Sequence, residues 1–174
     1  MNFRTLLAAA AGVATVAAAG SAFAASATAN ASATIVAPST LAATRDLTFG
    51  QIAKPTSGTS TITVASSSSA SATPSIDGGN AYVTTNGQAA SAAFQLTGSA
   101  NQAYTVDSTV LSFTNSAGNL ANIAALTPVA SAGSVGQLPA NGVQVLYVGG
   151  KFDITPSTAV TTYNGTLVLN VTYQ

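Results

Sequence analysis

Apolar and polar residues alternate along the last stretch of the chain, residues 163–174. The apolar side chains stand at Tyr163, Leu167, Leu169, Val171 and Tyr173, and the polar ones at Thr166, Asn170 and Thr172. A period of two is typical of a β-strand with one face in a core and the other in water. A helix would spread these apolar residues around its circumference. We therefore predict a long strand here, placed centrally in a sheet.

Shorter stretches of the same kind occur throughout the chain. They cover residues 47–52, 60–65 with Ile62 and Val64 inward, 94–96, 104–113 and 143–154. Gly50 and the pair Gly149-Gly150 interrupt them where a bulge or bend is expected. Residues 94–106 read as a hairpin, residues 66–72 as a polar edge strand or loop, and residues 117–141 as loop with one short helical turn or strand.

The number and spacing of these runs indicate the fold class. Several short strands, frequent turn signals and no convincing long helix are typical of an all-β antiparallel sandwich of about seven strands. A chain of 174 residues has room for one such domain. We assign it to residues 38–174, with a closed barrel as the second choice.

A second alternating stretch precedes this domain, in residues 25–37. One row holds Ala25, Ala27, Ala29, Ala31, Ala33 and Ile35, and the other holds Ser26, Thr28, Asn30, Ser32 and Thr34. Alanine favours helices, so propensity and periodicity disagree here. Because the period is strict and residues 34–36 are β-branched, we predict an extended segment that ends at Pro38.

The N-terminus has the features of a secretory signal. Arg4 supplies a positive charge, residues 6–20 are apolar and rich in alanine, and Ala22-Phe23-Ala24 has the small-x-small form of a cleavage site. The apolar run is too short and too weakly hydrophobic for a stable membrane anchor. We therefore expect residues 1–24 to be a cleaved signal peptide and the remainder to be exported.

Composition narrows the chemistry. Charged residues make up 5% of the chain, with four Lys and Arg in all, too few for a nucleic-acid surface. Histidine and cysteine are absent, as are glutamate and tryptophan. Disulfides, thiolate nucleophiles, zinc sites of the usual ligand types and histidine-based catalysis are therefore excluded.

The acidic residues do not indicate a catalytic or metal site either. They are Asp46, Asp77, Asp107 and Asp153, well separated in the sequence. Each lies beside a turn or strand signal, where a solvated or turn-capping role is expected. Asp77-Gly78-Gly79-Asn80 is a weak calcium signal, because such sites need several converging carboxylates. We predict no enzymatic activity, no cofactor and no metal.

The order of the strand motifs resembles that of a known family. The motifs are Leu47-Thr48-Phe49-Gly50, Phe94-x-Leu96-x-Gly98, Tyr104-x-Val106, Leu146-x-Val148-Gly149-Gly150-x-Phe152, Tyr163-x-Gly165 and Val171-x-Tyr173. Together they resemble a bacterial secreted family designated domain of unknown function 4402. That family is similar to the Mat/Ecp fimbrial major subunits and the spore coat U proteins, which are relatives of chaperone–usher pilins.

The resemblance implies an immunoglobulin-like sandwich at the cell surface or in the periplasm. It implies a structural subunit that associates with copies of itself, helped by a periplasmic chaperone and an outer-membrane assembly protein. Leu167, Leu169, Val171 and Tyr173 would form the strand that pairs with the chaperone. Ala27, Ala29, Ala31, Ala33 and Ile35 would complete a neighbouring subunit. The disulfide of many pilins is absent here, and this second row is almost all alanine.

Two alternatives remain open at this stage. Both segments are also compatible with ordinary strands of a self-contained sandwich. The second alternative is functional: a monomeric binding module of the cell surface or periplasm. A carbohydrate-binding module usually displays a platform of aromatic rings, whereas this chain lacks tryptophan and places Tyr163 and Tyr173 in an apolar row. Tyr82 and Tyr147 remain as exposed candidates.

Overall fold

The computed structural model describes residues 26–35, 38–84, 88–113 and 120–174. The chain divides into two units, Met1–Thr34 and Ile35–Gln174, which we describe separately. The predicted signal peptide, residues 1–24, lies outside the described residues. Residues 26–35 belong to no strand or helix, and each of them is exposed.

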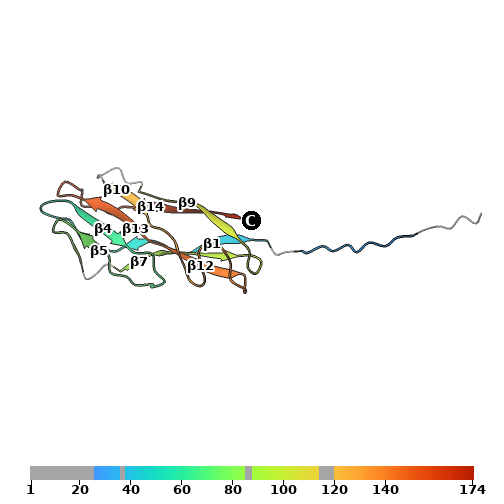
Figure 1. The fold of residues 1–174 in the computed structure, drawn as a ribbon. Coiled ribbons are helices and arrows are strands. Elements are labelled where there is room, and N and C mark those ends of the chain that lie inside the picture. Colours follow the sequence, from blue (N-terminus) through green and yellow to red (C-terminus); the bar gives the residue numbers. More distant parts are fainter. Residues whose placement is uncertain (1–25, 36–37, 85–87, 114–119) are drawn as a thin grey trace, which may run out of the picture. The chain divides into compact units, whose positions relative to one another are not determined.

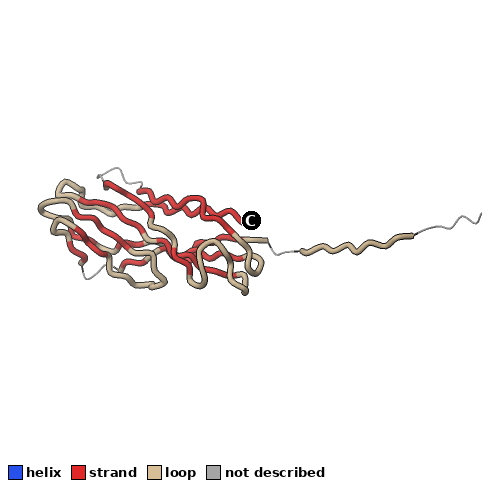
Figure 2. The backbone as a smooth tube through the Cα atoms, in the orientation of Figure 1, coloured by secondary structure: helices blue, strands red, loops and turns tan. Residues whose placement is uncertain are grey.

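All regular elements in the described part of the second unit are β-strands (Figures 1 and 2). They are β1 (Thr40–Arg45), β2 (Thr48–Phe49), β3 (Ile52–Ala53), β4 (Ser60–Val64), β5 (Ser75–Asp77), β6 (Tyr82–Val83), β7 (Ala89–Ala90), β8 (Ala92–Thr97), β9 (Tyr104–Phe113), β10 (Ala121–Ala125), β11 (Val129–Ala130), β12 (Val143–Val148), β13 (Gly150–Ile154) and β14 (Gly165–Tyr173). The predicted all-β class is confirmed.

The strands form two four-stranded sheets and three two-stranded ladders. The sheets have the orders β1-β8-β12-β11 and β10-β13-β4-β5, and the ladders are β14-β9, β2-β7 and β3-β6. All of these pairs are antiparallel, as predicted. The pairs β1–β8, β2–β7 and β3–β6 follow one another along the same two stretches of chain, with breaks such as Gly50, whose φ is 74°.

At the bend predicted at Gly149, the chain crosses from one sheet to the other. Before it, β12 pairs with β8, and after it, β13 pairs with β4. A Cβ atom at Gly149 would clash with the backbone oxygen of Val64. Only glycine therefore fits at this crossing, and the residues on both sides keep their inward phase: Leu146, Val148, Phe152 and Ile154 are all buried.

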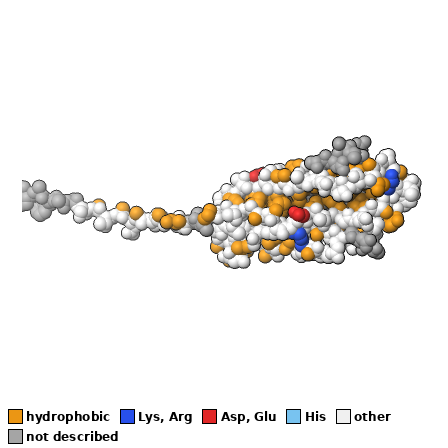
Figure 3. All heavy atoms as spheres, turned by 180° about the vertical axis from the view of Figure 1, so that it is seen from behind, with side chains coloured by type: hydrophobic (Ala, Val, Ile, Leu, Met, Phe, Trp, Pro, Cys, Tyr) orange, Lys and Arg blue, Asp and Glu red, His pale blue; other side chains and the backbone are white. Residues whose placement is uncertain are grey.

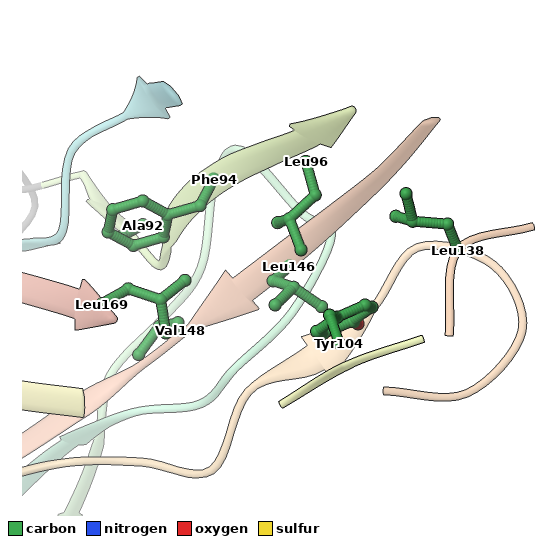
Figure 4. Close-up of a cluster of buried hydrophobic side chains, with 8 residues drawn as sticks. All are labelled: Ala92, Phe94, Leu96, Tyr104, Leu138, Leu146, Val148 and Leu169. Atoms are coloured by element: carbon green, nitrogen blue, oxygen red, sulfur yellow. The ribbon is translucent and has the colours of Figure 1, made fainter. Parts of the chain in front are cut away.

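The buried side chains form two clusters. The larger one combines β8 and β12 with single residues from other elements, and consists of Ala92, Phe94, Leu96, Tyr104, Leu138, Leu146, Val148 and Leu169 (Figure 4). The smaller one is built on Ile62, Phe152 and Ile154. As predicted, Ile62 and Val64 of β4 are fully buried. The larger cluster continues into partly buried residues of β9 and β14, and the smaller one into partly buried residues of β2 and β9.

The pairing of β8 and β9 differs from the prediction. The sequence indicated a hairpin, whereas β8 pairs with β1 and β12, and β9 pairs with β14. The connection between them bonds instead to residues 138–142. The backbone N–H of Gly98 donates to the oxygen of Gly142, and the backbone oxygen of Gln102 accepts a hydrogen bond from the N–H of Leu138. The hairpin prediction was wrong because closeness in sequence does not fix which edge a strand occupies.

Two further stretches resolve the alternatives that the sequence left open. Residues 66–71 are a loop, and Ala72 makes a single antiparallel bridge with Ala89 rather than an edge strand. The uncertain stretch 117–141 contains two strands, β10 and β11, in its described part, and no helical turn. Leu111 and Phe113 do extend the strand that starts at Tyr104, and the register shifts between Asn170 and Val171 of the partner.

The burial of Leu169 gives a direct test of the fold. Leu169 is 6% exposed within the larger cluster, whereas its neighbour Val168 is 46% exposed. Leu169→Asp should abolish folding, because a buried unpaired charge costs several kcal/mol against a total stability of about 5–15 kcal/mol. Val168→Asp should stay folded. Thermal melts followed by circular dichroism would measure both, and a wild-type melting temperature for Leu169→Asp would contradict the strand phase.

Candidate assembly surface

The predicted C-terminal row occupies one face of β14. Leu169 is buried, and Leu167, Val171 and Tyr173 are half-buried against the larger cluster. The even-numbered residues of the strand, 166 to 172, are all exposed. This confirms the predicted alternation. The four predicted residues therefore lie together, with the side chains of β9 beside them in register.

One edge of β14 has no strand partner in the described structure. The strand pairs with β9 alone, over nine residue pairs from Gly165↔Phe113 to Tyr173↔Tyr104. The predicted central position was therefore wrong, because a period of two identifies the buried face and not the number of neighbours. An edge of this kind presents a row of N–H and C=O groups that another strand can pair with.

The strand β1 is open in the same way. It pairs with β8 alone among the described strands, and its residues 40–44 are exposed on both faces. This double exposure explains why no alternating pattern marked the strand in the sequence. At one end, the Tyr173 hydroxyl donates a 2.7 Å hydrogen bond to the backbone oxygen of Thr40. A side chain thus joins β14 to β1, although their backbones do not pair.

Away from the contact between Tyr173 and Thr40, side chains from the β1–β2 segment and from β9 meet above the start of β13. Leu47 lies between β1 and β2, Phe49 ends β2, and Leu111 belongs to β9. All three approach Gly150, where a Cβ atom would lie 2.7 Å from Leu111, 3.0 Å from Leu47 and 3.1 Å from Phe49. The segment β1–β2 and the β9–β14 ladder therefore flank one part of the core. We call this region, from Thr40 and Tyr173 to Phe49, the open seam.

Apolar side chains along the open seam are only partly covered. Leu47, Phe49, Leu167 and Val171 pack against the buried clusters and remain half-buried. By contrast, the core residues of β4, β8 and β12 include Ile62, Leu96 and Leu146, which are 0% exposed. Figure 3 shows apolar side chains gathered in a band along one face of this unit. The core is less completely covered at the seam than in these central strands.

The two strands that flank the open seam carry few charges, although the exposed Asp46 follows β1 directly. The strand β14 contains no charged residue, and β1 contains Arg45 alone. The guanidinium of Arg45 donates to the backbone oxygens of Ser67, Ser68 and Ser91 and lies 5.4 Å from the ring centre of Tyr147. Its hydrogen bonds hold the serine-rich loop to the sheet. Its charge is therefore engaged, and the usual device against edge-to-edge pairing is missing from β14.

The predicted N-terminal row lies in the segment without secondary structure. Ala27, Ala29, Ala31 and Ala33 are exposed, and Ile35 is 96% exposed. No residue of this segment takes part in a strand. Its alternation therefore serves no sheet within the described chain.

A polar depression elsewhere on the domain was missed by the sequence reasoning. It is lined by Thr61, Asn122, Ile123, Ala124, Lys151 and Asp153. Thr61 donates a 2.7 Å hydrogen bond to Asp153, and Asn122 donates to the other carboxylate oxygen. These two bonds lower the pKa of Asp153 below its ordinary value, helped by Lys151. Both oxygens are thus engaged in joining β4, β10 and β13.

This depression lacks the ligands of a metal site. In the part of the chain that the structure describes, no group of three or more His, Cys, Asp or Glu side chains converges. A calcium or magnesium site would need several oxygen ligands free to bind. The described residues also include no helix long and apolar enough to cross a membrane.

One family model matches most of the chain. The family described as Domain of unknown function (DUF4402) matches residues 40–173. The chain belongs to this DUF4402 family. The match begins with β1 and ends with β14, so the family domain includes both strands that flank the open seam. No curated protein and no solved structure matches the chain.

The two tyrosines beside the seam predict an unusual dependence on pH. Burial raises the pKa of Tyr104, and burial together with Tyr104 raises the pKa of Tyr173. A group with a raised folded pKa contributes stability that is complete below its unfolded pKa, about 10, and that is lost as the pH rises through the folded value. The chain has no histidine, cysteine or glutamate, so it contains no side-chain type whose ordinary pKa lies near neutrality.

We therefore expect the melting temperature to be nearly constant from about pH 5.5 to pH 9 and to fall above about pH 10. Tyr173→Phe removes one phenol and its bond to Thr40. The melting temperature of this variant should therefore be lower at neutral pH and should fall less steeply above about pH 10. Calorimetry at a series of pH values would measure both. A marked change in stability between about pH 6 and pH 8 would contradict this expectation.

Proposed function

We propose that this protein is an exported, non-enzymatic structural subunit of a surface fibre or coat, and that its copies assemble through β-strand pairing at the open seam. In this proposal residues 1–24 are a cleaved signal and residues 38–174 form an immunoglobulin-like sandwich. One observation carries the proposal. The strand β14 contributes a row to the core but leaves its second backbone edge unpaired in the described structure, beside apolar side chains that are only half covered.

The N-terminal segment has the properties of the strand that the seam lacks. It alternates strictly, it has no strand partner in the described chain, and Ile35 is almost wholly in water. A strand of any sequence forms backbone hydrogen bonds when it is added to an open edge, and burial of its side chains contributes further stabilisation. Burying Ile35 would contribute about 1.5–3 kcal/mol and each alanine methyl about 0.8 kcal/mol.

The surface chemistry favours pairing with another copy of the same chain. The net charge is zero and charged residues are 5% of the sequence. Copies of such a protein repel each other little, and β14 presents no charge at its free edge. A monomeric surface protein usually blunts an edge like this with lysine, proline or a covering loop.

The resemblance to Mat/Ecp fimbrial subunits and spore coat U proteins supports the same role. In that case a periplasmic chaperone pairs with the open backbone edge of β14 before assembly, along Leu167, Leu169, Val171 and Tyr173, and an outer-membrane assembly protein exports the subunit. The mature chain would become part of a fibre or coat on the cell surface, with no cofactor and no nucleic acid involved.

A monomeric binding module is the second candidate. The observation that favours it is Tyr82, which is 62% exposed on the short strand β6. The other tyrosine considered for this role, Tyr147, lies under the guanidinium of Arg45. A lone exposed ring is a small platform for a sugar, so we rank this function below assembly.

Deletion of residues 25–33 tests the proposed function. The shortened protein should fold with the circular dichroism spectrum of the mature chain and should fail to form polymers, because the pairing strand is gone. Size-exclusion chromatography with light scattering would measure the size of both. A third chain, with residues 26–33 replaced by glycine and serine, keeps the length while removing the apolar row, and it too should stay monomeric.

Two outcomes would contradict the proposal. If the mature and shortened chains were identical stable monomers under conditions where cells produce fibres, strand exchange would be excluded. If the shortened chain unfolded, residues 25–33 would instead be the first strand of a self-contained sandwich.

A further inference from the structure

We infer that the open seam selects a strand with small inward side chains and rejects one with large side chains, so that each subunit recognises the alanine row of a second copy of this chain. The inference rests on the proposed function and specifies the partner of the same site. It follows from how the space beneath the seam is already filled.

Large side chains of the chain itself occupy this space along the length of the seam. At the first end, Tyr173 crosses from β14 to Thr40 and packs beside Tyr104, with 6.3 Å between ring centres. In the middle, Leu47 and Leu111 reach down to Gly150. The layer beneath an incoming strand therefore already contains side chains from both flanks.

Aromatic rings fill the other end. The ring centre of Phe49 lies 4.8 Å from that of Phe152 and 6.1 Å from that of Phe113, and Phe113 lies 5.6 Å from Phe152. Such spacings are those of rings in contact. A leucine or phenylalanine on an added strand would have to displace one of these side chains.

Gly150 shows how tightly this layer is packed. A single Cβ atom there would come within 2.7 Å of Leu111. The layer reaches the backbone of β13, so its side chains have no room to move deeper when a strand arrives. Inserting extra carbon atoms into a packed region forces strained rotamers and backbone shifts. The seam therefore needs to be covered by small groups and has no pocket for large ones.

The alanine row matches this requirement. Ala27, Ala29, Ala31 and Ala33 offer one methyl group each, and the single large residue, Ile35, stands at the end of the row, where it need not lie over the packed layer. An alanine strand buries little apolar surface, but its small side chains fit where larger ones would clash, and this makes the pairing specific. A strand with large inward residues is excluded by size, and discrimination arises from a clash as well as from a fit.

Leucine substitutions in the full mature chain test the inference without touching the folded domain. The double variant A29L/A31L adds bulk to the inward row, and the control variant T28L/N30L adds similar bulk to the other row. All four positions are exposed in the segment without secondary structure, so both variants should fold normally. We expect A29L/A31L to require at least about tenfold more protein for half-maximal assembly, and T28L/N30L to assemble like the wild type.

A rescue variant separates size from other effects. Replacing Leu47 by alanine in the A29L/A31L chain removes bulk from the middle of the seam and should restore part of the lost assembly. Circular dichroism would verify that this chain is folded. Light scattering as a function of protein concentration measures assembly for all variants.

Each result decides a different claim. If A29L/A31L assembled as well as the wild type or better, the selection for small side chains would be disproved while assembly by strand pairing would stand. If both leucine variants lost assembly equally, the claim that only the row of Ala29 and Ala31 must be small would also be disproved. If the wild type itself remained monomeric at every concentration, the proposed function would fail and this inference with it.

Discussion

The unpaired edge of β14 is the constraint on which the rest of this structure depends. The strand places Leu169 in the larger buried cluster and holds nine residue pairs with β9, so the domain cannot be built without it. Its second edge nevertheless pairs with no strand in the described chain. A backbone edge can be satisfied by water, but the half-buried side chains beside it cannot gain their full burial without a further covering layer.

The lack of charge makes this edge more consequential. In most soluble domains, lysine or an inward-pointing charge discourages a foreign strand from pairing. Here the one charge on β1, Arg45, is bound to the carbonyls of the serine-rich loop, and β14 carries none. Without cysteine, the domain also has no disulfide to compensate for an incompletely covered core. Pairing between copies would complete the sheet and the core together.

Sequence periodicity was sufficient for some of these features, but not for the open seam. The buried face of β14 and the bend at Gly149 could both be predicted, because a period of two specifies faces and a glycine pair marks a close crossing. The edge position of β14 and the separation of β8 from β9 depend on contacts between distant segments, as does the convergence of Leu47, Phe49 and Leu111 over Gly150. A single sequence carries no local signal for such contacts. The strand β1 escaped prediction because it is exposed on both faces and does not alternate.

Amide hydrogen exchange of β14 tests the central claim most directly. In the isolated subunit, amides of β14 that are bonded to β9 should exchange slowly, and those that point to the open edge should exchange as fast as exposed amides. In assembled material the open-edge amides of β14 should become protected, together with those of residues 27–35, which belong to no strand in the free chain. If assembly left the exchange of both segments unchanged, the copies would be joined by another surface, and strand pairing at the open seam would be disproved.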